Sequence, residues 1–199
     1  MNTKKSNFFS NNISLSPAVL RLGIVLALVM YSVFGYLDFY AMPLNYSASW
    51  IIRYAIILPL LVIAFLLSYF KPFYRYSKLI MFLLLTFGQL GIIVMIGLTV
   101  QEEMAFHTYY TGLILVMLWA SFVFRINFTT TIYIAVSTII IYNLTALYVQ
   151  DILTLNNKTL GLSVLLNNNF FLISSAVLVL IGAYQFEKNV EENKKVNSE

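Results

Sequence analysis

The sequence predicts an all-α, polytopic membrane protein with six transmembrane helices and both termini in the cytoplasm. Hydrophobic residues make up 60% of its 199 residues, whereas charged residues make up only 10%. A water-soluble domain of this length could not cover its surface with so few charged side chains. Because a bilayer span needs ~20 mostly apolar residues, the chain has room for about six spans and little else.

Six apolar segments divide the chain. They cover residues 19–39, 50–70, 79–100, 109–124, 128–148 and 170–186. Ser16 and Pro17 form a typical helix start, and Pro59 predicts a kink in the second span. The connections expected between spans are a loop at 40–49, a basic turn at 71–78, an acidic loop at 101–107, a tight turn at 125–127 and a loop at 150–163.

Three regions follow from this pattern. Residues 1–16 are expected to be a disordered cytoplasmic N-terminus, residues 17–187 the six-helix transmembrane domain, and residues 188–199 a cytoplasmic helical tail. Glu–Lys pairs spaced four residues apart support a solvated helix in the tail. A helix that leaves the bilayer unbroken can transmit a movement, which suggests signal output. The alternative is a short polar tail that only stops translocation.

The basic residues predict the orientation. With the N-terminus in the cytoplasm, ten of the twelve Lys and Arg residues fall inside, and only Arg53 and Lys158 fall outside. This distribution is the positive-inside pattern of membrane proteins. The formal charge of +4 is therefore attributed to membrane topology, and no nucleic-acid partner is expected.

The composition also limits the chemistry. The chain has no Cys and one His, which argues against disulfides, iron–sulfur clusters and metal sites. No acidic residue lies deep inside a span, so no catalytic set can be assembled. We expect no catalytic residues, no metal and no cofactor.

Seven polar residues are candidates for a ligand site, and all but one lie near the outer ends of the spans in this topology. They are Asp38, Arg53, Gln89, Tyr109, Tyr110, Asn143 and Asn168. Polar groups that converge at one level of a helical bundle make a pocket for a small ligand plausible.

Each candidate also has a structural interpretation. Asp38 and Arg53 lie on antiparallel neighbours and could form either a ligand-facing ion pair or a staple at the helix ends. Gln89, which lies in mid-span, is more consistent with a hydrogen bond between packed helices. Tyr109 and Tyr110 are typical of the aromatic belt at a membrane surface.

Four stretches, read in order, resemble a known family. They are VFGYLDFYAMPLN, WIIRYAIILPLL, YYTGLILVMLW and LLNNNFFLISSAVLVLIGAYQFE. Over residues 20–187 the chain resembles the six-helix N-terminal membrane region of bacterial class III adenylate cyclases, and of some diguanylate cyclases and histidine kinases. The resemblance implies that the membrane region receives signals and positions a dimeric catalytic domain through the sixth helix.

These 199 residues contain no cyclase, GGDEF or kinase domain. Either the sequence is a piece of a longer enzyme, or the chain is a separate subunit that acts on a partner. We therefore expect a non-enzymatic sensory or regulatory module, which receives a signal at its outer side and passes it through the sixth helix to a cytoplasmic effector.

The expected partners are the lipid bilayer, a second copy of the chain, a cytoplasmic signalling enzyme and an unknown small ligand. The expected location is the bacterial inner membrane. The alternative function is a small-solute binding or transport subunit, which would place polar or broken helices near the midplane. Only Gln89 and Pro59 meet that requirement.

Overall fold

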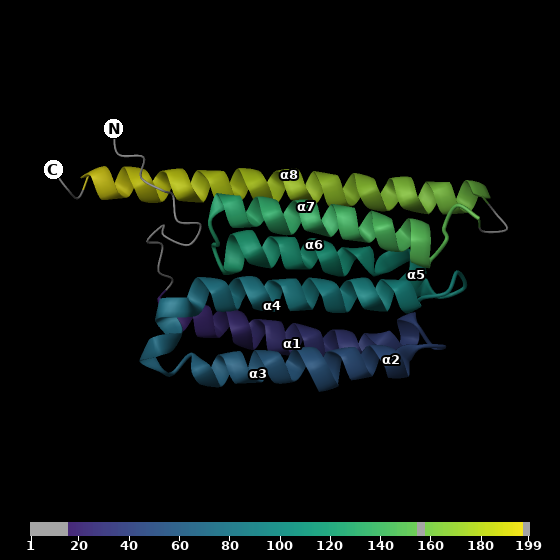
Figure 1. The fold of residues 1–199 in the computed structure, drawn as a ribbon, viewed down its shortest axis with the longest axis horizontal. Helices are drawn as coiled ribbons and strands as arrows, with labels where there is room; N and C mark the ends of the chain where they lie inside the picture. The colour runs from purple at the N-terminus through teal and green to yellow at the C-terminus, as the bar shows by residue number, and fades with distance from the viewer. Residues whose placement is uncertain (1–15, 155–157, 197–199) are drawn as a thin grey trace.

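The protein is a bundle of helices that lie side by side along one axis (Figure 1). The computed structural model describes residues 16–154 and 158–196, and no strand occurs within these ranges. The elements are α1 (Pro17–Ala41), α2 (Tyr46–Trp50), the π-helix η1 (Ile51–Ile57), α3 (Leu58–Leu67), α4 (Lys71–Leu98), α5 (Met104–Thr108), α6 (Tyr110–Leu118), the π-helix η2 (Trp119–Val123), α7 (Phe128–Leu144), the π-helix η3 (Thr145–Val149) and α8 (Lys158–Val196).

Five stretches of helix within the described ranges are long and apolar enough to cross a membrane. They are Pro17–Ala41, Tyr46–Leu67, Lys71–Leu98, Phe128–Val149 and Thr159–Asn193. A further apolar stretch, Tyr110–Val123, is helical but shorter. The prediction of an all-helical, multi-pass membrane protein is confirmed. The sixth span and the side on which the termini lie stay predictions.

The first helix begins as the sequence predicts. Ser16 caps α1 with its side chain, which accepts a hydrogen bond from the backbone N–H of Val19 at 3.4 Å, and Pro17 occupies the first turn. Pro lacks the N–H that a first turn leaves unpaired, so it fits there without loss. The expected disordered N-terminus otherwise lies outside the described residues.

Several predicted connections are wrong because helices continue past the apolar segments. The expected loop at 40–49 contains α2, and the expected basic turn at 71–78 is the first part of α4. Likewise α8 begins at Lys158, inside the loop expected at 150–163. A helix satisfies its own backbone in water as well as in lipid, so polarity alone does not end it.

Three π-helices were not predicted. In the second span η1 ends at Ile57, and Pro59 lies in the first turn of α3. The irregularity expected at Pro59 is therefore a change from π to α hydrogen bonding just before it. The other two π-helices, η2 and η3, directly precede the segments where positive φ angles occur, at Arg125 (45°) and Asp151 (48°). The tight turn expected at 125–127 is confirmed.

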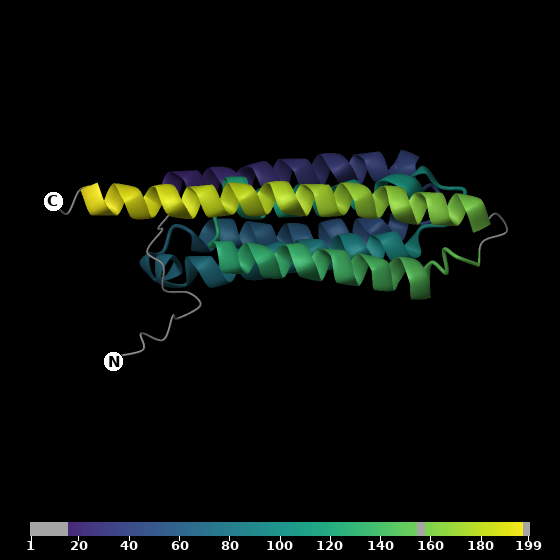
Figure 2. The ribbon, with the colours of Figure 1, turned by 90° about the horizontal axis from the view of Figure 1, so that it is seen from above.

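The bundle has a central helix and an extended end. In Figure 1, α4 lies between α1 and α3 on one side and α6, α7 and α8 on the other, consistent with the contacts among these helices. The C-terminal part of α8 projects beyond the other helices in both views (Figures 1 and 2). Because α1 starts at that same end, both ends of the described chain lie there.

Candidate ligand site

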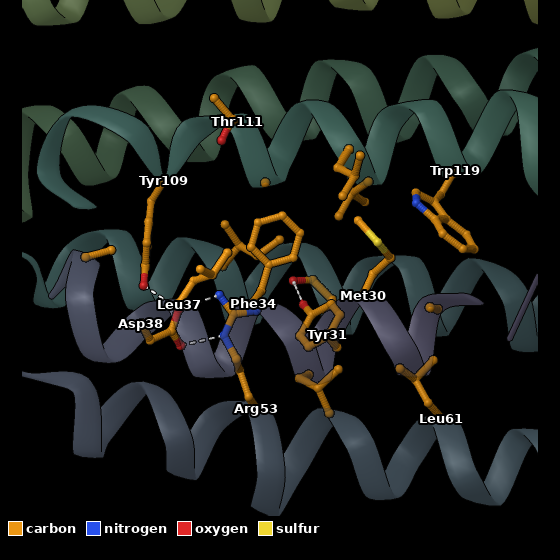
Figure 3. Close-up of a pocket in the computed structure, with 18 of the residues that line it drawn as sticks. Met30, Tyr31, Phe34, Leu37, Asp38, Arg53, Leu61, Tyr109, Thr111 and Trp119 are labelled. Carbon is orange, nitrogen blue, oxygen red and sulfur yellow. Dashed lines mark hydrogen bonds and ion pairs between the residues drawn. The ribbon is translucent and has the colours of Figure 1, made fainter. Parts of the chain in front are cut away.

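A cavity of about 340 Å³ lies between α1, α4 and α6, with η1 and α3 closing one side. Most of the side chains that line it are apolar, among them Met30, Phe34, Leu61 and Leu115. A polar group lies at one end of the cavity, where α1, η1 and the start of α6 meet (Figure 3). Pockets of this size and character are typical of small-molecule sites.

The polar end is built around a buried ion pair between Asp38 of α1 and Arg53 of η1. Arg53 Nε donates to Asp38 Oδ2 at 2.6 Å, and Arg53 Nη2 donates to Oδ1 at 3.1 Å. The side chains are 1% and 6% exposed, respectively. A charge buried among apolar groups is stable only if it is paired and hydrogen-bonded, and this bidentate geometry provides both.

Two hydroxyl groups complete the surroundings of Asp38. Tyr109, at the junction of α5 and α6, donates to Asp38 Oδ1 at 2.5 Å. Ser49 of α2 donates to Asp38 Oδ2. Each carboxylate oxygen therefore accepts from one nitrogen and one hydroxyl, so the acceptor capacity of Asp38 is largely used within the protein.

The spacing of residues along α1 directs one face into the cavity. Tyr31, Phe34 and Asp38 lie three to seven residues apart and thus share a face of the helix. The Tyr31 hydroxyl donates to the Gly88 carbonyl of α4 at 3.0 Å. The guanidinium carbon of Arg53 lies 5.2 Å from the centre of the Tyr31 ring and 5.8 Å from that of Phe34. Contacts with these aromatic rings hold Arg53 in place in addition to its bonds to Asp38.

The contact expected between Asp38 and Arg53 is confirmed, and Tyr109 joins them. Gln89 does not line the cavity. It is 2% exposed and donates to Ser137 Oγ of α7 at 3.2 Å, which matches the interpretation of a hydrogen bond between helices.

The remaining candidates belong to a second polar group, which joins α7 to α8. Asn143 and Asn169 exchange amide hydrogen bonds of 2.7 and 2.9 Å, and Asn168 donates to the Tyr142 hydroxyl at 2.8 Å. The Tyr110 ring packs against Phe171 of α8, with centroids 6.3 Å apart. The expectation that all outer polar residues converge on one pocket is therefore wrong, because Asn143 and Asn168 bond across the α7–α8 contact and Tyr110 packs between α6 and α8.

Sequence reasoning missed several residues of the site. Tyr31 carried a usable signal, since it lies seven residues before Asp38 on the same helix. Ser49 was assigned to a loop, so its approach to Asp38 was not foreseen. Glu103 is 2% exposed and accepts from the backbone N–H groups of Leu44 (3.0 Å) and Val100 (3.1 Å), which ties the loops at this end together.

The fold and the cavity define a multi-pass membrane protein with a ligand-sized site between its helices. The MASE8 family model matches residues 36–190, which is more than half of the chain. The chain belongs to this family of membrane-associated sensor domains. No curated protein and no solved structure matches it. The matched range includes Asp38, Arg53 and Tyr109 as well as most of α8.

Proposed function

We propose that the chain is a non-enzymatic sensory module of a bacterial inner membrane, which detects a ligand at the cavity and signals through α8 to a cytoplasmic enzyme. The observation that carries the proposal is the position of the buried Asp38–Arg53 pair. It forms the polar end of a ligand-sized cavity, at the end of the bundle opposite the projecting part of α8 (Figures 1 and 3). Membership of a sensor-domain family supports the same reading.

The proposal includes six spans. Taken together, α5, α6 and η2 extend from Met104 to Val123. At 1.5 Å per residue these 20 residues reach ~30 Å, about the thickness of the hydrocarbon core. With this segment as the fourth span, both termini lie on one side.

Basic residues support the cytoplasm as that side. Lys71 begins α4 and Arg125 precedes α7, and both helices start at the end of the bundle from which α8 projects (Figure 1). Lys188 follows on the projecting part of α8 itself. A cluster of basic residues at one end is the pattern expected of the cytoplasmic side.

A route for the signal is provided by the segment from Tyr109 to Val123. Its start contacts Asp38 through Tyr109, and Trp119 lines the cavity ten residues later. Its end packs on α8, where Ser121 Oγ donates to the Val179 carbonyl at 2.9 Å. Gly182 allows this close approach, because a Cβ added there would lie 3.0 Å from the Phe122 ring. Ligand-dependent displacement of α6 would therefore move α8.

A second contact would carry the movement to the cytoplasmic surface. The Arg125 guanidinium lies 4.9 Å from the centre of the Phe186 ring, and the Phe128 N–H donates to Glu187 Oε2 at 3.3 Å. The turn between η2 and α7 thus contacts α8 at the point where α8 leaves the bundle. Beyond this point α8 would engage a catalytic domain of the cyclase or kinase type, in the same chain or in a partner.

We further propose that two copies associate through α8. Leu178 and Ile181 are exposed on the surface of the bundle, whereas Ala176 and Ala183 face the other helices of the same chain. The projecting part is shorter than the three to four heptads that a stable coiled coil needs, so pairing would depend on the membrane helices.

Cysteine scanning tests the proposal, since the chain has no native cysteine. Single cysteines at positions 184–196 in native membranes are expected to cross-link with a period of three to four residues. Filling the cavity with Ala27→Phe should shift this pattern, whereas Val33→Phe, which places the same residue at an exposed position of α1 outside the cavity, should not. Monomers without cross-links at any position would instead favour the solute-binding or transport subunit.

A further inference from the structure

The cavity is elongated along the bundle axis. Its lining residues on α1 extend from Ala27 to Asp38 and beyond, and eleven residues of helix correspond to ~16 Å. On the opposite wall, Tyr109 and Trp119 are ten residues apart, or ~15 Å. Figure 3 shows Trp119 at the far end from Asp38 and Tyr109, near Met30, and Leu61 lies at the same end. The cavity therefore has a polar end and a long apolar end.

The polar end offers hydrogen-bond donors. Asp38 accepts from Arg53, Ser49 and Tyr109. Arg53 has five N–H groups, and its bonds to Asp38 use two of them. Arg53 also lines the cavity, and its third guanidinium nitrogen, Nη1, takes no part in the two bonds to Asp38. A ligand head at this end must supply oxygen acceptors.

Part of the cavity wall reaches the surface of the bundle. Among its lining residues, Leu37, Tyr40 and Met104 are 45%, 63% and 66% exposed on the outer surface of the bundle. A compound lying in the adjacent leaflet would have its head near the membrane surface and its tail toward the midplane. That orientation matches the polar and apolar ends of the cavity, so such a compound could enter sideways between α1 and α6.

We infer that the cavity binds a single-chain amphipathic compound from the lipid phase, with an oxygen-acceptor head at Arg53 and a hydrocarbon tail that reaches Trp119. This inference rests on the proposed function, because it names the ligand class of the same site. The tail leaves the hydrocarbon of the bilayer for an equally apolar lining, so it gains packing contacts with the cavity wall and no free energy of transfer out of water. Arg53 fixes the direction in which the compound lies.

Quenching of tryptophan fluorescence tests this arrangement directly. The chain has two tryptophans, Trp50 and Trp119, so Trp50→Phe leaves only the one in the cavity. In nanodiscs, dodecanoate brominated at its last carbon should quench Trp119 saturably, and dodecanoate brominated next to the carboxylate should quench it much less. Unlabelled dodecanoate should compete. Equal quenching by both positional isomers would overturn the proposed orientation.

Variants separate binding in the cavity from partition into the bilayer. Ala27→Phe, made in the Trp50→Phe background, should raise the half-quenching concentration at least about tenfold, because the added ring takes up space in the cavity that the tail would fill. Val33→Phe in the same background should leave it unchanged. The exposed Trp50, observed alone in Trp119→Phe, should show only a non-saturating response. Non-saturating quenching of Trp119 that is equal in both α1 variants would overturn the inference.

Compounds with altered heads test the role of Arg53 without changing the protein. The methyl ester of ω-bromododecanoate keeps an oxygen acceptor but loses the charge. Saturable quenching of Trp119 by the carboxylate or by its methyl ester therefore supports the inference. ω-Bromododecane has no acceptor and should quench at least about tenfold more weakly than the better of the two, which corresponds to one lost hydrogen bond to a charged group. Equal quenching by all three would overturn the assigned head group.

The quenching result is independent of signal output. Saturable quenching with no change in cross-linking of α8 would uphold the ligand class and refute the sensory role. If a compound changes the cross-linking of α8 but does not protect Trp119 from quenching, the sensory role is upheld and the proposed ligand class is refuted.

Discussion

The hydroxyl of Tyr109 donates a 2.5 Å hydrogen bond to Asp38, a residue 71 positions earlier in the chain. This bond joins the fourth apolar segment to the first at the polar end of the cavity. Since Trp119 follows on the same segment and the segment then packs on α8, the bond connects the ion pair with the helix that leaves the bundle. The proposed signalling route begins at this contact.

Removal of the Tyr109 hydroxyl should destabilise the protein. Tyr109→Phe takes a donor from a buried carboxylate, and the loss of a partner for a buried polar group costs ~1–3 kcal/mol. We expect a lower melting temperature in detergent. Tyr110→Phe is the matched control, because it keeps the ring that contacts Phe171 and should change stability by less than ~0.5 kcal/mol. Equal effects of the two changes would contradict the assigned role of Tyr109.

The Asp38–Arg53 pair should show strong coupling in a double-mutant cycle. Asp38→Asn and Arg53→Gln each leave a buried charge without its partner, which costs ~3–5 kcal/mol, so the double variant should lose less than the sum. The control cycle uses Lys188 and Glu192, which lie 3.9 Å apart on the projecting part of α8 with both side chains about 60% exposed. Exposed pairs contribute ~0–1 kcal/mol. Additive losses at Asp38 and Arg53 would show that they act separately.

The amide pair between Asn143 and Asn169 should stabilise the α7–α8 contact without affecting the ligand. Each single change to Leu leaves the other amide with only the bond from its nitrogen to a carbonyl of its own helix, so its oxygen loses the partner on the facing helix. The double change replaces both amides with apolar groups and should recover part of the stability. Hydrogen bonds between membrane helices contribute ~0.6 kcal/mol on average, so a modest effect is expected. Quenching of Trp119 by ω-bromododecanoate should remain unchanged. A large loss of quenching in a folded variant would place these residues in the ligand site.

The proposed topology can be checked with reporter fusions. Fusions after Thr154, in the connection between η3 and α8, should report the outer side, and fusions after Val196 should report the cytoplasm. The reason is the concentration of basic residues at the end of the bundle from which α8 projects. If both fusions report the same side, the six-span topology and the outer position of the cavity are both wrong.

The sequence alone located the apolar segments and the contact between Asp38 and Arg53. Both succeed for simple reasons: hydrocarbon requires long apolar helices, and a charge at the end of one helix needs a partner on its antiparallel neighbour. The boundaries were less accurate, since α8 begins at Lys158 and runs through Gly161 and polar residues before the apolar segment starts.

The rest of the site could not be predicted from local patterns. Tyr109 reaches Asp38 only because α5 packs beside α1, and no spacing in the sequence encodes that distance. The Asn residues of α8 looked equivalent to the other outer polar residues, yet Asn168 and Asn169 bond to α7. Which polar side chains pair with each other and which face a cavity depends on helix rotation, which the bundle sets as a whole.

The central claim is that occupancy of the cavity moves the projecting part of α8. Spin labels at Lys71→Cys and Asn189→Cys, on exposed positions of α4 and α8, would report the distance between the cytoplasmic ends of these helices. The labelled chain is diluted with unlabelled chain so that only distances within one copy are measured. In parallel samples, the relief by dodecanoate of Trp119 quenching by ω-bromododecanoate shows whether dodecanoate occupies the cavity.

Dodecanoate is expected to shift this distance distribution in the labelled chain and in the Val33→Phe control, but not in Ala27→Phe. The contradicting result is a distribution that stays the same with and without dodecanoate, although dodecanoate relieves the quenching of Trp119 by ω-bromododecanoate and so occupies the cavity.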